Sequence, residues 1–170
     1  RPVILFVADS ATNKRKGFGL LQQARTDWGD PLLISIGGGA PQVSSSEQHI
    51  HLGKLSSDRL LAAAYSAADV FVIPSLEDNL PNTVLESMAC STPVVGFDTG
   101  GIPDMVRPGK TGWLVKVGDV RALREAVEQA LVDELAREQR GTRAREVIEE
   151  EYTLERQARE HRQLYESVTS

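Results

Sequence analysis

Short runs of apolar residues alternate along the chain with stretches in which apolar residues recur at helical spacing. The runs have the length of buried strands, and several end at glycine or proline, which favour turns. The pattern predicts strands at Val3–Val7, Leu32–Ile36, Ile50–Leu52, Val70–Ile73, Thr92–Gly96 and Trp113–Val115, and helices at Gly17–Trp28, Ser57–Ala68, Pro81–Ala89, Val120–Val132, Glu134–Glu151 and Thr153–Ser167. Such alternation is typical of a parallel sheet with helices on both faces, so we predict an α/β fold with a doubly wound parallel sheet.

The chain has 170 residues, of which 41% are hydrophobic and 25% are charged. This length suits one domain with a complete core, and neither an internal repeat nor a low-complexity linker divides it. The chain begins on a strand without an initiator methionine, so we expect it to be part of a longer protein. No segment resembles a signal peptide or has the length of a transmembrane helix, and we expect a cytoplasmic protein that is at most peripheral to the inner face of a membrane.

Charge and cysteine content exclude some functions. The net charge of −5 gives no surface for nucleic acid. Cys90 is the single cysteine, which excludes an internal disulfide and fits a reducing compartment. It follows Met88 in an apolar run, so we expect a packing residue rather than a nucleophile. His49, His51 and His161 are too scattered in the sequence to predict a metal site.

Parallel sheets bind ligands in the loops beyond the carboxyl ends of their strands. The first such loop, Asp9–Gly17, carries Lys14, Arg15 and Lys16 just before a helix. Helix amides together with cations could bind an anion there. The loop lacks the glycine spacing of a dinucleotide fold or a P-loop, and a basic solvated turn is the alternative.

Two further loops contain paired or triple glycines. Gly37–Gly39 would let a ligand or another backbone approach closely, although a tight turn needs glycine as well. Phe97–Val106 passes through Gly100 and Gly101 into a short helical turn, whose amides could meet a ligand or could simply connect two elements.

The loop after the strand Val70–Ile73 carries adjacent carboxylates, Glu77 and Asp78, and a helix is predicted from Pro81. Asp78 and Glu86 could each hold one end of a polyhydroxylated ligand, with helix amides between them for a phosphate. The alternative is that Asp78 or Asn79 caps the helix and Glu86 is an exposed helical residue.

Helical spacing assigns faces to this segment. Asn82 and Glu86 are four residues apart and share one face, while Leu85, Met88 and Ala89 are predicted to point to the core.

The segments Ala68–Cys90 and Thr92–Asp104 together resemble the signature of family 4 (group 1) glycosyltransferases. The order of motifs that the family shows around this signature is also found here, in Lys16-Gly17, Gly37–Gly39, Gly53 and Gly109–Val115. The resemblance therefore covers essentially the whole chain. Members have the GT-B architecture, in which two Rossmann-like domains face a cleft. The chain resembles only the C-terminal, donor-binding domain, which implies a single domain over residues 1–170, no N-terminal acceptor domain, and a last helix (153–167) that crosses back to that absent domain.

The resemblance implies roles for individual residues. Glu86 would hydrogen-bond the ribose hydroxyls of the nucleotide, Asp78 would contact hydroxyls of the donor sugar, and Lys16 would neutralise the diphosphate. Amides near Leu80–Thr83 would hold phosphate and sugar, and the backbone of Gly53–Leu55 would meet the base. The full set of implied donor-binding residues is Ser10, Lys14, Arg15, Gly38, Gly53, Lys54, Leu55, Glu77, Asn79, Leu80, Pro81, Asn82 and Thr83.

Two positions depart from the family pattern. The first acidic position is usually Glu and here is Asp78, with Glu77 adjacent to it. An arginine usually precedes the lysine, and Ser10 takes its place; Lys14 or Arg15 would have to supply that charge. The sequence Asp78-Asn-Leu-Pro-Asn82 looks like a branch that acts in polysaccharide assembly.

The implied activity is that of a hexosyltransferase (EC 2.4), transferring from a nucleotide-diphosphate sugar to a glycan or lipid-linked acceptor with retention at the anomeric carbon. Lys16 and helix amides, rather than a metal cofactor, would stabilise the leaving diphosphate. A lone domain would bind donor without turnover. The alternatives are a nucleotide-sugar 2-epimerase and a non-catalytic domain whose site has decayed. The sequence leaves the base, donor sugar, acceptor and oligomeric state open.

Overall fold

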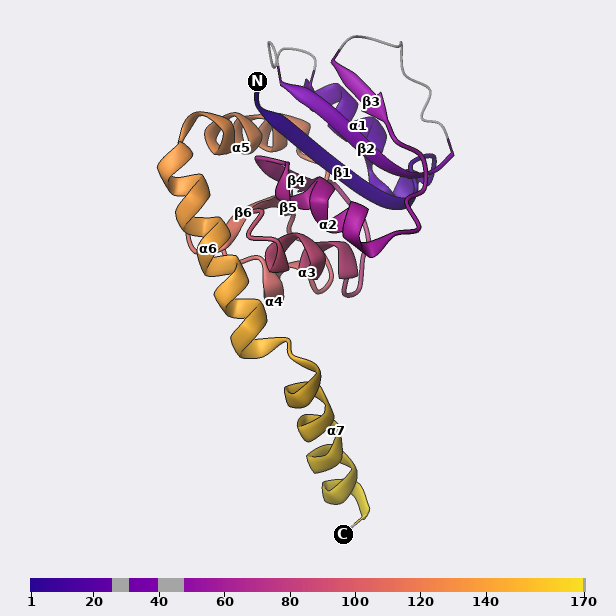
Figure 1. Ribbon diagram of the computed structural model, residues 1–170, viewed down its shortest axis with the longest axis vertical. Helices are drawn as coiled ribbons and strands as arrows, with labels where there is room; N and C mark the ends of the chain where they lie inside the picture. Colours follow the sequence, from indigo (N-terminus) through magenta and orange to yellow (C-terminus); the bar gives the residue numbers. More distant parts are fainter. Residues whose placement is uncertain (26–30, 40–47, 170) are drawn as a thin grey trace.

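The computed structural model describes residues 1–25, 31–39 and 48–169. Within these residues, six strands form one sheet in the order β3-β2-β1-β4-β5-β6, and every neighbouring pair is parallel (Figure 1). The strands are β1 Val3–Ser10, β2 Leu32–Gly38, β3 His49–His51, β4 Val70–Ile73, β5 Val94–Phe97 and β6 Gly112–Val115. The predicted Rossmann-like α/β fold class is therefore confirmed.

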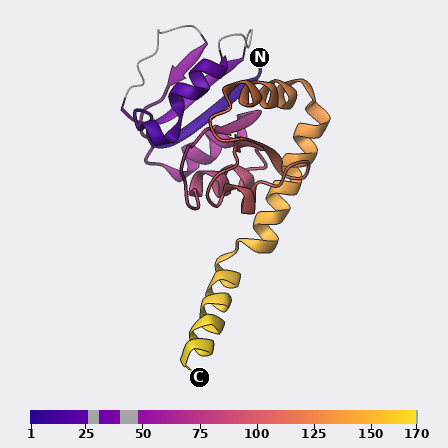
Figure 2. The same ribbon diagram turned by 180° about the vertical axis from the view of Figure 1, so that it is seen from behind.

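Helices cover both faces of the sheet (Figures 1 and 2). Those described are α1 Phe18–Ala24, α2 Asp58–Ser66, α3 Asn82–Ala89, α4 Ile102–Met105, α5 Val120–Val132, α6 Glu134–Glu151 and α7 Leu154–Thr169, with a 3-10 turn, η1, at Lys14–Lys16. One core cluster joins the sheet to α1 and α5, and the other joins it to α2, α3, α4 and α6. Burial on both faces explains why the central strands are continuously apolar.

Several element bounds differ from the prediction. β1 continues past Val7 to Ser10, because Ser10 pairs with Gly38 of β2 after a register shift. β5 begins at Val94 and not at Thr92, whose side chain is buried and bonds to the carbonyl of Tyr65. The predicted helix Gly17–Trp28 is confirmed from Phe18 to Ala24, where α1 ends, and the last predicted residues, 26–28, lie outside the described residues.

The last helix, α7, extends away from the body of the molecule (Figure 1). Four of its apolar side chains are largely exposed, at 78% for Leu154, 61% for Leu164, 67% for Tyr165 and 75% for Val168. Leu154, Tyr165 and Val168 lie on one side of the helix, with Leu154 three turns before the other two. These exposed apolar side chains, named here the apolar stripe, have no cover among the described residues. None of the described helices is both long enough and apolar enough to cross a membrane.

Candidate functional site

The two central strands, β1 and β4, are the point at which the chain order of the sheet reverses. The loop after β1 leads to α1 on one face, and the loop after β4 leads to α3 on the other. Between the two loops lies a cavity of about 340 Å³. It is lined by the end of β1 and by Lys16, Ile73, Ser75, Asp78, Leu80, Pro81, Asn82 and Thr83. Open α/β sheets bind ligands in such a crevice.

Lys16 and Asp78 meet in this cavity. Lys16 Nζ lies 2.8 Å from Asp78 Oδ2, and the side chains are 24% and 13% exposed. The 3-10 turn places the lysine, because the amide of Leu76 donates to the carbonyl of Arg15 at 2.8 Å. Gly17 permits this contact, since a Cβ at that residue would lie 1.7 Å from the Pro74 carbonyl oxygen. Lys16 and Asp78, to which the resemblance gives the diphosphate and the donor sugar, therefore form one ion pair, although they come from separate motifs.

The loop that carries Asp78 rests on a second loop. The amide of Gly101 donates to the carbonyl of Asn79 at 2.7 Å, and Gly100 packs against the carbonyl of Asp78. The Gly-Gly loop after β5 is thus a support for the acidic loop. Glu77 is exposed and does not line the cavity, whereas Asp78 does, so the geometry favours Asp78 as the first acidic residue.

The surroundings of Glu86 differ from the alternative in which it is an exposed helical residue. It is partly buried rather than exposed, and its Oε2 accepts a hydrogen bond of 3.0 Å from the hydroxyl of Tyr65. It does not line the cavity that contains Lys16 and Asp78, although Asn82 and Thr83 on the same helix do. The sequence did not indicate that Tyr65 contacts Glu86, because an aromatic residue in an alanine-rich helix is typical of the core.

The start of α3 also differs from one expectation. Pro81 is the N-cap residue and no side chain caps the helix, so the alternative that Asp78 or Asn79 is the cap is wrong. Without a capping side chain, the first amides of α3 remain available to a ligand in the cavity. Ala89 is exposed, which contradicts its predicted core position. Met88 lies in the core as predicted, Leu85 packs against the core while partly buried, and Val84 is buried as well.

Ser75 is a site residue that the sequence did not reveal. It lines the cavity and is 1% exposed, and its Oγ has no hydrogen-bond partner among the described residues. A buried unpaired hydroxyl costs about 1–3 kcal/mol, so its retention at the edge of a cavity requires an explanation.

Some of the remaining predicted residues line this cavity, and the others lie outside it. Lys14, Arg15, Lys54 and Asn79 are exposed, and Leu80 and Pro81 line the cavity. The hydroxyl of Ser10 bonds to that of Thr12 at 2.9 Å. Gly53 accepts a bond from the amide of Gly37 at 2.9 Å, Leu55 packs on the core, and Gly38 ends β2. This hydrogen bond joins the Gly37–Gly39 loop to the Gly53–Leu55 loop. Neither loop lines the cavity that contains Lys16 and Asp78.

His49 and His51, expected to be scattered, lie together on β3. His49 Nε2 and His51 Nδ1 both bond to the buried hydroxyl of Ser35, at 2.8 and 2.9 Å. Burial, and then the charge of Arg25, lower the pKa of His49. Within the described residues, no group of three or more His, Cys, Asp or Glu side chains is arranged to hold a metal ion.

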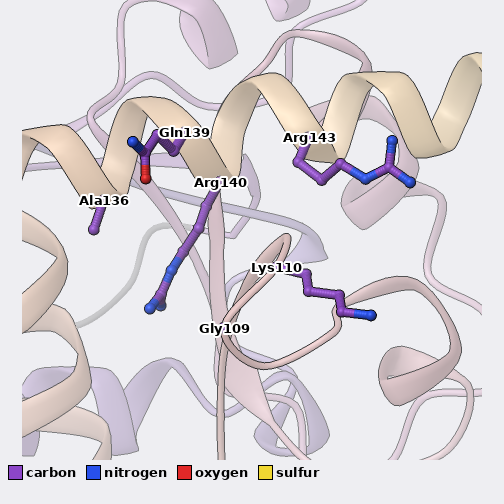
Figure 3. A pocket seen from close by; sticks show the side chains of 6 residues that line it. All are labelled: Gly109, Lys110, Ala136, Gln139, Arg140 and Arg143. Atoms are coloured by element: carbon purple, nitrogen blue, oxygen red, sulfur yellow. The ribbon is translucent and has the colours of Figure 1, made fainter.

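A larger hollow of about 490 Å³ lies between α6 and the turn that precedes β6, where Arg140 points toward the turn at Gly109 (Figure 3). Its arginines are already engaged. The guanidinium of Arg140 stacks on the Trp113 ring at 3.8 Å, and Arg143 pairs with Glu146 and Glu150. This hollow lies at the amino ends of the strands, opposite the edge at which parallel sheets bind ligands.

The sequence model of the glycosyl transferases group 1 family matches residues 1–133. This chain belongs to that family. The glycosyltransferase chain is 30% identical over 191 residues to the alpha-maltose-1-phosphate synthase of Mycolicibacterium smegmatis, an alignment that covers 100% of this chain and 49% of that relative. The chain thus spans about half the length of that relative.

Solved structures agree with this assignment. The sucrose-phosphate synthase of Thermosynechococcus elongatus superposes with a TM-score of 0.88 and 29% identity, covering 99% of this glycosyltransferase chain and 45% of that protein. Anabaena HepE, solved in complex with UDP-glucose, superposes with a TM-score of 0.81 at 17% identity, covering 98% of this chain and 48% of HepE. The fold is that of one half of a GT-B glycosyltransferase.

Proposed function

We propose that this chain is the donor-binding half of a retaining hexosyltransferase, which transfers a sugar from a nucleoside diphosphate to a glycan or lipid-linked acceptor in polysaccharide biosynthesis. The observation that carries the proposal is the Lys16–Asp78 pair in the cavity between the loops that follow β1 and β4. It combines a cation for a diphosphate with a carboxylate for sugar hydroxyls, at the sheet edge where this fold binds ligands. The UDP-glucose complex of Anabaena HepE supports a uridine nucleotide as the first one to test.

The chemistry proposed for the site is electrostatic. Lys16 and the first amides of α3 would face the phosphates, and both would stabilise the negative charge that develops on the leaving diphosphate. A diphosphate that takes Lys16 releases Asp78 to accept hydrogen bonds from the sugar. Glu86 would accept hydrogen bonds from the ribose. These groups supply charge neutralisation from the protein itself, so we propose that no metal is required.

The acceptor site is proposed to lie on a second domain. The chain spans about half the length of the curated relative described above, and the apolar stripe on α7 has no cover among the described residues. A second domain that packs on α7 would bury that stripe and close the cleft over the donor. We expect the chain alone to bind donor without transferring the sugar.

Calorimetric titration of the chain with UDP, GDP and ADP, with and without Mg²⁺, tests the proposal. Saturable binding of one diphosphate, equal in both conditions, is the expected result. Absence of binding for all three would contradict it and favour a non-catalytic domain. In the protein that includes the second domain, turnover of a nucleotide sugar without acceptor would instead indicate a 2-epimerase.

Ser75→Ala is expected to weaken binding of the diphosphate about 3- to 10-fold, the equivalent of one net hydrogen bond. Ser75 lines the cavity, and its hydroxyl has no other partner among the described residues. Without ligand, the variant should be as stable as the parent or more stable, since it removes a buried unpaired group. Titration and urea unfolding measure the two effects.

Ser87→Ala is the matched control for this variant. Ser87 is also fully buried, but its hydroxyl donates to the carbonyl of Thr92 at 2.8 Å. Its removal should cost about 1 kcal/mol or more of stability and leave the affinity unchanged. If Ser75→Ala behaved like Ser87→Ala, its hydroxyl would be a structural group and not a ligand contact.

A further inference from the structure

Tyr65 of α2 is fixed in the core and contacts Glu86 of α3. The side chain is fully buried, and its ring packs edge-on against Phe71, with ring centroids 5.5 Å apart and planes at 80°. The backbone of Tyr65 is held as well, since the hydroxyl of Thr92 donates to its carbonyl at 2.7 Å. The phenol oxygen lies 3.0 Å from Glu86 Oε2. A rigid donor therefore fixes one oxygen of a carboxylate that is partly exposed.

Tyr65 stays a neutral donor in this arrangement. Burial raises the pKa of Tyr65 far above its usual range, and the charge and hydrogen bond of Glu86 add to the effect. A buried phenol needs an acceptor, and any neutral carbonyl would serve that structural need. Here the acceptor is a carboxylate at the edge of the core, whose second oxygen has no hydrogen-bond partner among the described side chains.

We propose that Tyr65 is a positioning residue that holds Glu86 Oε2 and leaves Oε1 free to accept from a vicinal diol of the ligand. This rests on the proposed function, in which the diol is the ribose of the donor nucleotide. Glu86 lies one helical turn beyond Asn82 and Thr83, which line the cavity beside Lys16. A fixed carboxylate loses less side-chain entropy on binding than a free one, so Tyr65 would increase the preference for ribose.

Tyr65→Phe separates this role from a structural one. The variant keeps the packing of the ring and removes only the hydroxyl, whereas Glu86→Ala would leave a buried phenol without an acceptor. The measurement is calorimetric titration with UDP and with 2′-deoxy-UDP. We expect the affinity for UDP to fall about 3- to 10-fold, as for the loss of one net hydrogen bond, and that for 2′-deoxy-UDP to change less than 2-fold. The preference for ribose would then be smaller than in the parent.

The control is Tyr152→Phe, the same chemical change at a tyrosine whose hydroxyl donates to the carbonyl of Asp104. It should leave both affinities unchanged. Equal loss for the two nucleotides in Tyr65→Phe, or loss for neither, overturns the positioning role while the proposed function stands. If the parent chain binds neither nucleotide, nor GDP nor ADP, the proposed function fails and the role of Tyr65 fails with it.

A second variant covers the case in which Tyr65→Phe does not fold. Glu86→Gln keeps an amide oxygen as acceptor for Tyr65 and replaces the second oxygen by a donor. We expect it to fold and to prefer UDP over 2′-deoxy-UDP less than the parent does. A preference equal to that of the parent would overturn the proposal.

Discussion

Lys16→Met is expected to weaken binding of the nucleoside diphosphate about 10- to 100-fold. Lys16 lines the cavity and its side chain is 24% exposed. In such a partly buried place a hydrogen bond to a charged group contributes about 1.5–3 kcal/mol. Methionine keeps most of the aliphatic stem and removes the charge. Calorimetric titration with the diphosphate that binds the parent chain measures the loss.

Lys14→Met is the matched control. Lys14 belongs to the same 3-10 turn, but it is exposed and does not line the cavity. The two variants have the same net charge, so long-range attraction of the anion falls equally in both. A change of less than about 3-fold is expected for Lys14→Met, as for a solvated charge. Equal losses in both variants would show that the loop attracts anions only as a patch and would contradict a contact from Lys16.

Asp78→Asn examines the other partner of the pair. In the structure Asp78 forms an ion pair with the ammonium group of Lys16, which the diphosphate would need. The ligand therefore has to break this ion pair. Loss of the carboxylate should leave affinity for the diphosphate unchanged or raise it, and should lower the added affinity that the sugar of a nucleotide sugar provides. Weaker diphosphate binding in this variant would contradict the competition between Asp78 and the ligand for Lys16.

The alternation of apolar runs and helical stretches was sufficient to predict the strands and the fold class. It also placed the candidate loops at the carboxyl ends of strands. It could not show that Lys16 and Asp78, 62 residues apart, form one ion pair. That contact depends on β1 and β4 being neighbours, and periodicity carries no information about the order of strands in a sheet. The resemblance to a known family supplied the roles but no contact between the residues.

Other parts of the site lacked a distinct sequence signal. Tyr65 and Ser75 are ordinary core and turn residues in the sequence, and only their hydrogen bonding in the fold distinguishes them. The end of β1 was placed too early because Asp9 and Ser10 are polar, although a polar residue is acceptable where a strand reaches a cavity. Each of these differences occurs near the candidate site, where the hydrophobic pattern gives way to binding chemistry.

Gly100→Ala is expected to destabilise the chain by about 2–5 kcal/mol and to weaken binding of a nucleotide sugar. Gly100 has a φ of +54°, and a Cβ there would lie 1.6 Å from the carbonyl oxygen of Asp78. The left-handed backbone costs an alanine about 1–2 kcal/mol, and the forced shift of a packed loop adds about 1–3 kcal/mol. The shift would move Asp78 away from Lys16. Urea unfolding gives the stability, and titration gives the affinity.

Gly118→Ala isolates the conformational part of this loss. Gly118 has a φ of +78°, and a Cβ there would meet nothing within 4 Å. It lies in the turn between β6 and α5, away from the cavity, so its substitution should cost only about 1 kcal/mol and leave the affinity unchanged. Equal destabilisation by the two substitutions would mean that the acidic loop yields easily to a methyl group. In that case the Gly-Gly loop could not be what fixes Asp78, and the ion pair itself would have to hold the loop in place. Because the diphosphate breaks that pair in the proposed mechanism, a loop fixed only by the pair would be released on binding, whereas a loop fixed by Gly100 keeps Asp78 in place for the sugar.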